Sequence, residues 1–139
     1  MINLTGTETD KNLRNAFSGE SEAAMKYSFY AQAARNEGYQ QIADIFQETA
    51  DNEREHAEIW FKLLHNGMPA TGENLMEADG GERYEYETMY PTFAKEAREE
   101  GFTKIAALFE LVAKIEKEHM ERYETLKANV DNGTVFKKQ

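Results

Sequence analysis

Two Glu-x-x-His pairs that lie 63 residues apart are the first candidates for chemistry in this sequence. They are Glu53 with His56 and Glu116 with His119. Residues three apart lie on one face of an α-helix, so each pair can present a carboxylate and an imidazole to one metal ion. The pattern is weak when it occurs alone, because glutamate is abundant in this chain. Its repetition at a fixed offset makes it informative.

Both pairs interrupt stripes of apolar residues that recur at steps of three and four, and Glu20 interrupts a third such stripe nearer the N-terminus. The apolar members of the three stripes are Leu13, Phe17, Ala24, Tyr27, Ala31 and Ala34; Ile42, Phe46, Trp60 and Leu63; and Ile105, Phe109, Val112, Tyr123 and Leu126. Carboxylates buried in a core must be protonated, paired with cations or bound to metal. Because the chain has three histidines and most lysines and arginines fall off these stripes, a carboxylate-bridged pair of metal ions is favoured over a salt-bridged polar core.

The fourth helix of such a site has no carboxylate at the expected position. The 63-residue offset maps Glu20 onto Arg83, with Glu82 and Glu85 on either side. Both glutamates could face inward if the helix shifts its register. Pro91 supplies a cause, because proline removes one backbone hydrogen bond and clashes with the carbonyl four residues earlier. The alternative is a helix that begins at Pro91 and leaves both glutamates exposed.

Two tyrosines, Tyr27 and Tyr90, are related by the same offset and lie about two turns from these carboxylates. Their phenols could donate hydrogen bonds to carboxylates that bind metal. Equally, they could be core tyrosines whose hydroxyls need some partner.

An internal repeat must position all of these residues. Segments 34–46 and 97–109 are identical at seven of 13 positions, and each contains a central glycine, Gly38 or Gly101, of the kind that ends a helix. We expect helices over 9–37, 39–66, 82–100 and 102–130, a long loop over 66–81 and an irregular tail over 129–139. The predicted fold is all-α: one domain over 1–139, a four-helix bundle of two repeated hairpins with one long crossover.

Composition excludes several other classes. The 139 residues are 40% hydrophobic and 30% charged, with a net charge of −10 that argues against nucleic acid and anionic membranes as partners. Cysteine is absent, which excludes disulfides and thiolate metal sites. With no long apolar run and no basic segment followed by an apolar one at the N-terminus, we expect a cytoplasmic protein.

Several segments of the sequence resemble the rubrerythrins. They are GESEAAMKY, ETADNEREHA, MYPTFAKEAREEGF and EKEH, and the resemblance covers essentially the whole chain. It implies a ferritin-like bundle with two non-haem iron ions that reduces hydrogen peroxide to water. The ligand set alone would also accept manganese or zinc as substitutes.

The resemblance also implies a role for each ligand. Glu53 and Glu116 would bridge the two irons, Glu20 would be a terminal ligand of the first iron, and Glu82 and His119 would complete the second.

Further roles follow from the same resemblance. Glu85 would bind the first iron in the oxidised state and give way to His56 on reduction, which makes these two the catalytic ligands. The GERYEY stretch matches the family's pair of glutamates three apart, and Tyr27 and Tyr90 match its tyrosines beside the metal ligands.

Typical rubrerythrins continue into a rubredoxin domain whose four cysteines hold one iron. This sequence has no cysteine, so it is either the di-iron domain of a longer protein or a natural short form. Turnover would then need an external electron donor such as a rubredoxin. We expect a homodimer, and the 66–81 connection would permit exchange of helix pairs between protomers. Two other functions stay open: iron oxidation and storage as in ferritins, and a non-catalytic metal-binding bundle.

Overall fold

The computed structural model describes residues 2–135, which form helices and short connections without a strand in that range. The elements are α1 (Glu8–Asn36), α2 (Gln40–His65), α3 (Thr71–Tyr84), the π-helix η1 (Glu85–Met89), α4 (Tyr90–Glu99) and α5 (Thr103–Asp131). They form two compact units, Met1–Met68 and Pro69–Gln139. No helix of the described part combines the length and apolar character needed to cross a bilayer.

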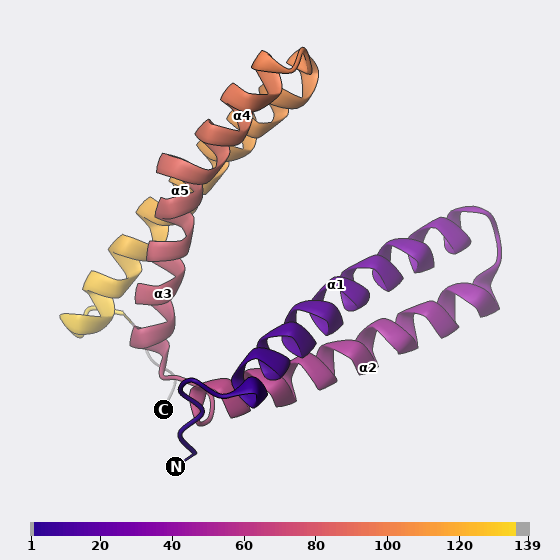
Figure 1. The fold of residues 1–139 in the computed structure, drawn as a ribbon, viewed down its shortest axis with the longest axis horizontal. Helices are drawn as coiled ribbons and strands as arrows, with labels where there is room; N and C mark the ends of the chain where they lie inside the picture. The colour runs from indigo at the N-terminus through magenta and orange to yellow at the C-terminus, as the bar shows by residue number, and fades with distance from the viewer. Residues whose placement is uncertain (1, 136–139) are drawn as a thin grey trace. The chain divides into compact units, whose positions relative to one another are not determined.

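The first unit is an antiparallel hairpin of α1 and α2 (Figure 1). Thr7 caps α1, since its hydroxyl accepts a hydrogen bond from the Asp10 backbone N–H at 3.0 Å. The turn is made by Gly38, whose φ of +89° suits glycine alone among common residues. Five alanines are its buried apolar residues: Ala31, Ala34, Ala43, Ala50 and Ala57. Small side chains at these positions let the two helices approach closely.

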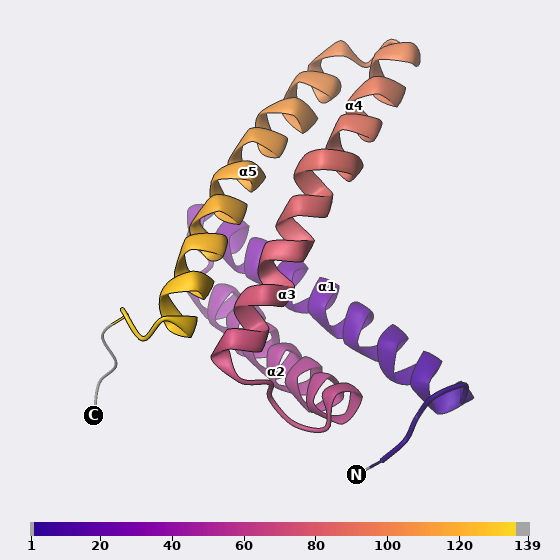
Figure 2. The ribbon, with the colours of Figure 1, turned by 90° about the vertical axis from the view of Figure 1, so that its left-hand side faces the viewer.

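The second unit repeats this hairpin, with α3, η1 and α4 forming one continuous rod that packs along α5 (Figure 2). Gly101 has a φ of +90° at the turn, and the next residue, Phe102, donates its N–H to the Ala97 carbonyl at 2.8 Å. Tyr39 makes the same bond to Ala34 in the first hairpin, at 2.9 Å. Ala94, Ala97, Ala106 and Ala113 are buried 63 residues after their counterparts. The predicted repeat of two helical hairpins is therefore confirmed.

The loop predicted over 66–81 is wrong for residues 71–81, which belong to α3, and the predicted helix start at 82 is wrong for the same reason. Only residues 66–70 connect the hairpins. Three glycines in this stretch disfavour a helix by about 1 kcal/mol each. Packing along α5 outweighs that cost, and Glu73 helps at the N-terminus by accepting the Ala70 backbone N–H at 3.4 Å.

The irregular tail predicted over 129–139 is also partly wrong. Helix α5 continues to Asp131, and only 132–135 are irregular among the residues described. Residues 136–139 of that prediction lie outside the described part.

Candidate metal centre

The first hairpin brings Glu20 from α1 together with Glu53 and His56 from α2. One ligand atom from each of the three lies within 4.8 Å of the others. His56 Nδ1 is 3.1 Å from Glu20 Oε2 and 3.8 Å from Glu53 Oε2. The two carboxylates are half-buried, while the imidazole is about half exposed. The face that carries the cluster is therefore open on the imidazole side.

The second hairpin builds a matching cluster from Glu82 on α3 and from Glu116 and His119 on α5. Their ligand atoms again lie within 4.8 Å of one another. His119 Nδ1 is 3.6 Å from Glu82 Oε1 and 3.8 Å from Glu116 Oε1. Glu116 is the least exposed of these side chains, at 13%. Sequence spacing thus identified the first cluster and the Glu116–His119 pair of the second, whereas it left the place of Glu82 open.

Glu82 takes the position of Glu20 because η1 inserts one extra residue into the helix. The Tyr90 backbone N–H donates to the Glu85 carbonyl five residues earlier, the pattern of a π-turn. Before this turn the offset between repeats becomes 62, which pairs Glu20 with Glu82 in place of Arg83. Of the two outcomes that the sequence left open, the register shift is therefore the one observed. The alternative, a helix that begins at Pro91, is wrong.

Glu85 lies beside the second cluster, on the π-turn itself. The pKa of Glu85 is raised, first by a hydrogen bond with the Glu116 carboxyl and then by burial. The pKa of Glu116 is raised in turn, chiefly by a hydrogen bond with Glu82. In the first hairpin, a hydrogen bond with Glu20 and burial raise the pKa of Glu53. Without a cation, neighbouring carboxylates share protons instead of all carrying charge.

These raised pKa values predict that the metal-free protein loses stability as pH rises. The protonated carboxyls stabilise the folded state fully below pH 4.5, the ordinary carboxyl pKa. This stabilisation is lost as pH rises through the raised pKa of each group. We expect Glu85→Gln, which cannot ionise, to melt at a higher temperature than the wild type at pH 7. At pH 4 the two should melt together. Thermal unfolding with a chelator present measures the melting temperatures of both proteins at both pH values. The same difference in melting temperature at pH 4 and pH 7 would contradict the shared proton.

The two tyrosines pack on aromatic neighbours. Tyr27 stacks on Phe46 with ring centroids 6.1 Å apart, and Tyr90 stacks on Phe109 at 6.0 Å. Burial and the charges of Glu85, Glu116 and Glu82 raise the pKa of Tyr90, so its phenol lies near the second cluster. Hydrogen bonds from Tyr27 and Tyr90 to metal ligands stay a prediction.

The donor set fits a metal. Each cluster offers two carboxylates and one imidazole, which is half of the ligand set that ferritin-like dimetal proteins use. Glu82 Oε2 is buried without a hydrogen-bond partner, a costly arrangement that a bound cation would relieve. Hard oxygen donors with neutral imidazole suit iron, manganese or zinc.

Asp79 is a residue that the sequence reasoning missed, because it lay in the predicted loop. It is one turn before Glu82 on α3. Its Oδ1 is buried without a hydrogen bond, with the Arg83 guanidinium 3.5 Å away. The available signal in the sequence was its spacing of three residues from Glu82, which places both carboxylates on one face of a helix.

Paired helical hairpins with Glu and Glu-x-x-His ligands define a ferritin-like carboxylate metalloprotein. The rubrerythrin family model matches residues 11–127. The chain belongs to the rubrerythrin family, whose members are di-iron proteins with a ferritin-like fold. The predicted all-α, ferritin-like fold class and the family are confirmed, whereas the predicted long crossover is wrong, because only residues 66–70 join α2 to α3.

Two sequence relatives support the assignment to this family. The chain is 46% identical to rubrerythrin of Porphyromonas gingivalis, covering 97% of this chain and 74% of that protein. It is 43% identical to rubrerythrin of Nitratidesulfovibrio vulgaris, covering 98% and 78%. A solved structure of fully reduced, all-ferrous nigerythrin is 34% identical, with a TM-score of 0.46 over 88% of this chain and 67% of that one.

Rubrerythrin-1 of Clostridium acetobutylicum is longer within the matched region. The two chains are 44% identical over 154 aligned positions, covering 99% of this chain and 79% of that protein. Because this chain has 139 residues, at least 15 residues of that relative have no counterpart here.

Proposed function

We propose that the chain reduces hydrogen peroxide to two waters at a di-iron centre, with electrons from an external donor such as a rubredoxin. The main support is the pair of matched clusters, Glu20, Glu53 and His56 on one hairpin and Glu82, Glu116 and His119 on the other. Membership of a di-iron family supports the identity of the metal. The reaction consumes one peroxide, two electrons and two protons.

In this proposal Glu53 and Glu116 would be shared by the two metals, while Glu20, Glu82 and His119 would each hold one of them. Two ferrous ions would supply the two electrons that cleavage of the O–O bond requires. The chain's own residues set the charge of the site. Four or five carboxylates would balance two divalent cations.

Glu85 and His56 are the residues that we propose to exchange as ligands between oxidation states. An anionic oxygen suits ferric iron better, whereas a neutral imidazole suits ferrous iron. Glu85 stands on the π-turn, where the helical hydrogen-bond pattern is already altered. In the metal-free protein the pKa of Glu85 is raised, first by a hydrogen bond with Glu116 and then by burial, and a carboxyl near the reacting centre could relay protons.

Anaerobic loading with ferrous iron followed by peroxide titration tests this function. We expect one peroxide to oxidise two bound irons, with the optical absorption of oxo-bridged ferric iron. Glu85→Gln should keep ferrous binding but slow peroxide-dependent oxidation by about a hundredfold or more. Glu87→Gln, an exposed neighbour on the same turn, is the matched control and should react as the wild type.

Other results would favour the alternatives. Oxidation by oxygen with mineral uptake into a large hollow assembly would indicate iron storage. Binding of zinc or manganese without any ferrous-dependent consumption of peroxide would indicate a non-catalytic bundle.

A further inference from the structure

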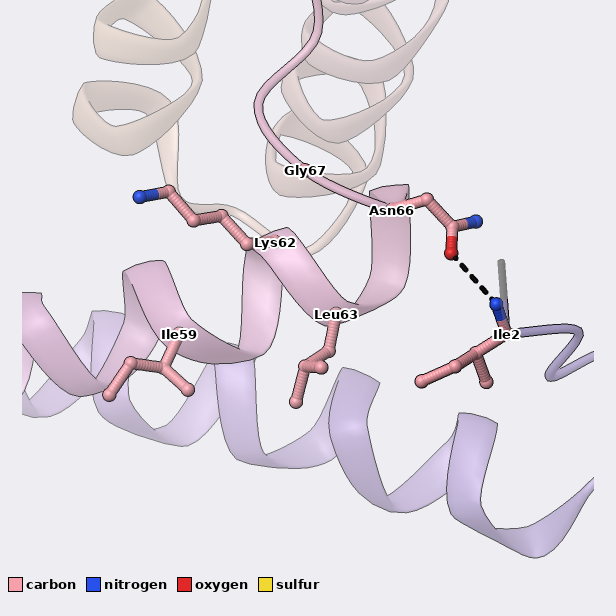
Figure 3. Close-up of a pocket in the computed structure, with 6 residues that line it drawn as sticks. All are labelled: Ile2, Ile59, Lys62, Leu63, Asn66 and Gly67. Carbon is pink, nitrogen blue, oxygen red and sulfur yellow. Dashed lines mark hydrogen bonds between the residues drawn. The ribbon is translucent and has the colours of Figure 1, made fainter.

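The connection between the hairpins is short, and both of its ends are defined. Helix α2 ends at His65, and Asn66 and Gly67 follow in left-handed conformations, with φ of +54° and +111°. Figure 3 shows this end of α2, where the Asn66 side-chain oxygen accepts the Ile2 backbone N–H at 3.3 Å. Helix α3 begins at Thr71. Only residues 66–70 are available to bridge the two helices.

Five residues cannot span the length of the bundle. Helix α2 has 26 residues and is therefore about 39 Å long. A five-residue segment reaches at most about 20 Å when fully extended. Short connections reverse the chain direction, whereas the single crossover of a ferritin-like bundle joins two parallel helices and must run back along its length. The residues that the Clostridium acetobutylicum relative has in addition are consistent with a longer crossover there.

Each hairpin also presents an apolar face that its own two helices do not cover. The side chains flank the metal ligands and correspond in pairs 63 residues apart: Tyr30 and Phe93, Ile42 and Ile105, Leu63 and Leu126. All six are between 37% and 48% exposed. A face that is apolar at both ends and carries carboxylates in the middle requires a matching face opposite it.

We infer that α1–α2 of one chain packs against α3–α5 of a second copy, so that two chains form two bundles by exchanging hairpins. This inference depends on the proposed dimetal site, because each site then takes Glu20, Glu53 and His56 from one chain and Glu82, Glu116 and His119 from its partner. In this arrangement no chain must cross the length of its own bundle. The short connection only has to pass between neighbouring bundles.

Complementation between two metal-binding variants tests the exchange. Chains carrying Glu53→Ala and Glu116→Ala, with different affinity tags, are produced together and the mixed dimer is isolated. With exchange, one bundle of the mixed dimer has both defects and the other has none. We expect half the wild-type metal per dimer by elemental analysis and none in either variant alone. Without exchange each bundle lacks one bridging carboxylate, so absence of metal from the mixed dimer overturns the inference.

The length of the connection provides a second test that needs neither metal nor peroxide. Light scattering should give the wild type twice the 16.0 kDa mass of one chain. Insertion of about 15 glycine and serine residues after Met68 should allow each chain to close its own bundle and shift the mass toward the monomer. A monomeric wild type, or an insertion variant that remains fully dimeric, overturns the exchange. Dimers that exchange hairpins and bind metal but do not consume peroxide would overturn only the proposed function.

Discussion

Replacing Glu53 or Glu116 with alanine is expected to abolish binding of the metal pair. Each carboxylate belongs to its own cluster and would serve both ions as a bridge. Loss of a residue that merely orients a ligand costs about 10–100-fold in metal affinity. Loss of a ligand shared by both ions should cost more. Elemental analysis after ferrous loading gives the stoichiometry, and full occupancy in both variants would contradict the bridging roles.

Matched controls separate this effect from a general loss of charge. Glu55 and Glu118 lie two residues after the bridging glutamates, are related by the same offset and are exposed. Their alanine variants should bind metal as the wild type does. At pH 7 the metal-free Glu53→Ala and Glu116→Ala proteins should melt no lower than the wild type, because each variant removes a carboxyl whose pKa is raised in the folded state.

Inserting one alanine after Thr88 in η1 is expected to remove the second metal site while preserving the helices. The π-turn already absorbs one extra residue, so a second extra residue lengthens the regular helix and changes its register. Each residue before the turn then rotates by about 100° relative to α5. Glu82 would leave the Glu116–His119 face. We expect at most one tightly bound metal per site, measured by elemental analysis and by titration with a spectroscopic metal such as cobalt.

The control for this insertion keeps the length of the helix. Thr88→Ala removes an exposed side chain from the same turn without changing the register, so it should bind both metals. Circular dichroism should show similar helix content for the two variants. Two tightly bound metals in the insertion variant would show that the register set at the π-turn does not position Glu82.

Much of the candidate site could be predicted from local spacing. Glu53, His56, Glu116 and His119 sit where a 3.6-residue period places them, on the same stripe as Phe46 and Phe109. Gly38 and Gly101 mark the two turns, because their backbone conformation is costly for other residues. Such signals depend on neighbours within one or two helical turns, so a single sequence contains them in full.

The ligands from the rod opposite α5 required the structure. Their inward orientation depends on one extra residue absorbed at η1, and spacing alone left both outcomes for Glu82 and Glu85 open. Helix α3 was predicted to be a loop, because Gly72, Gly80 and Gly81 weaken a helix as a local property. Packing along α5 supplies the stabilisation that local propensity does not. Because this stretch was predicted to be a loop, the sequence reasoning also missed Asp79.

The sequence by itself therefore determined the two hairpins, their turns, and one carboxylate–imidazole pair on each. Helical periodicity and glycine conformation are local properties, and they need no distant contact to act. The tertiary structure decided where α3 begins, how short the connection to α2 is, and that Glu82 rather than Arg83 faces His119. Those outcomes depend on contacts between helices far apart in the chain, whose stabilisation outweighs local preference.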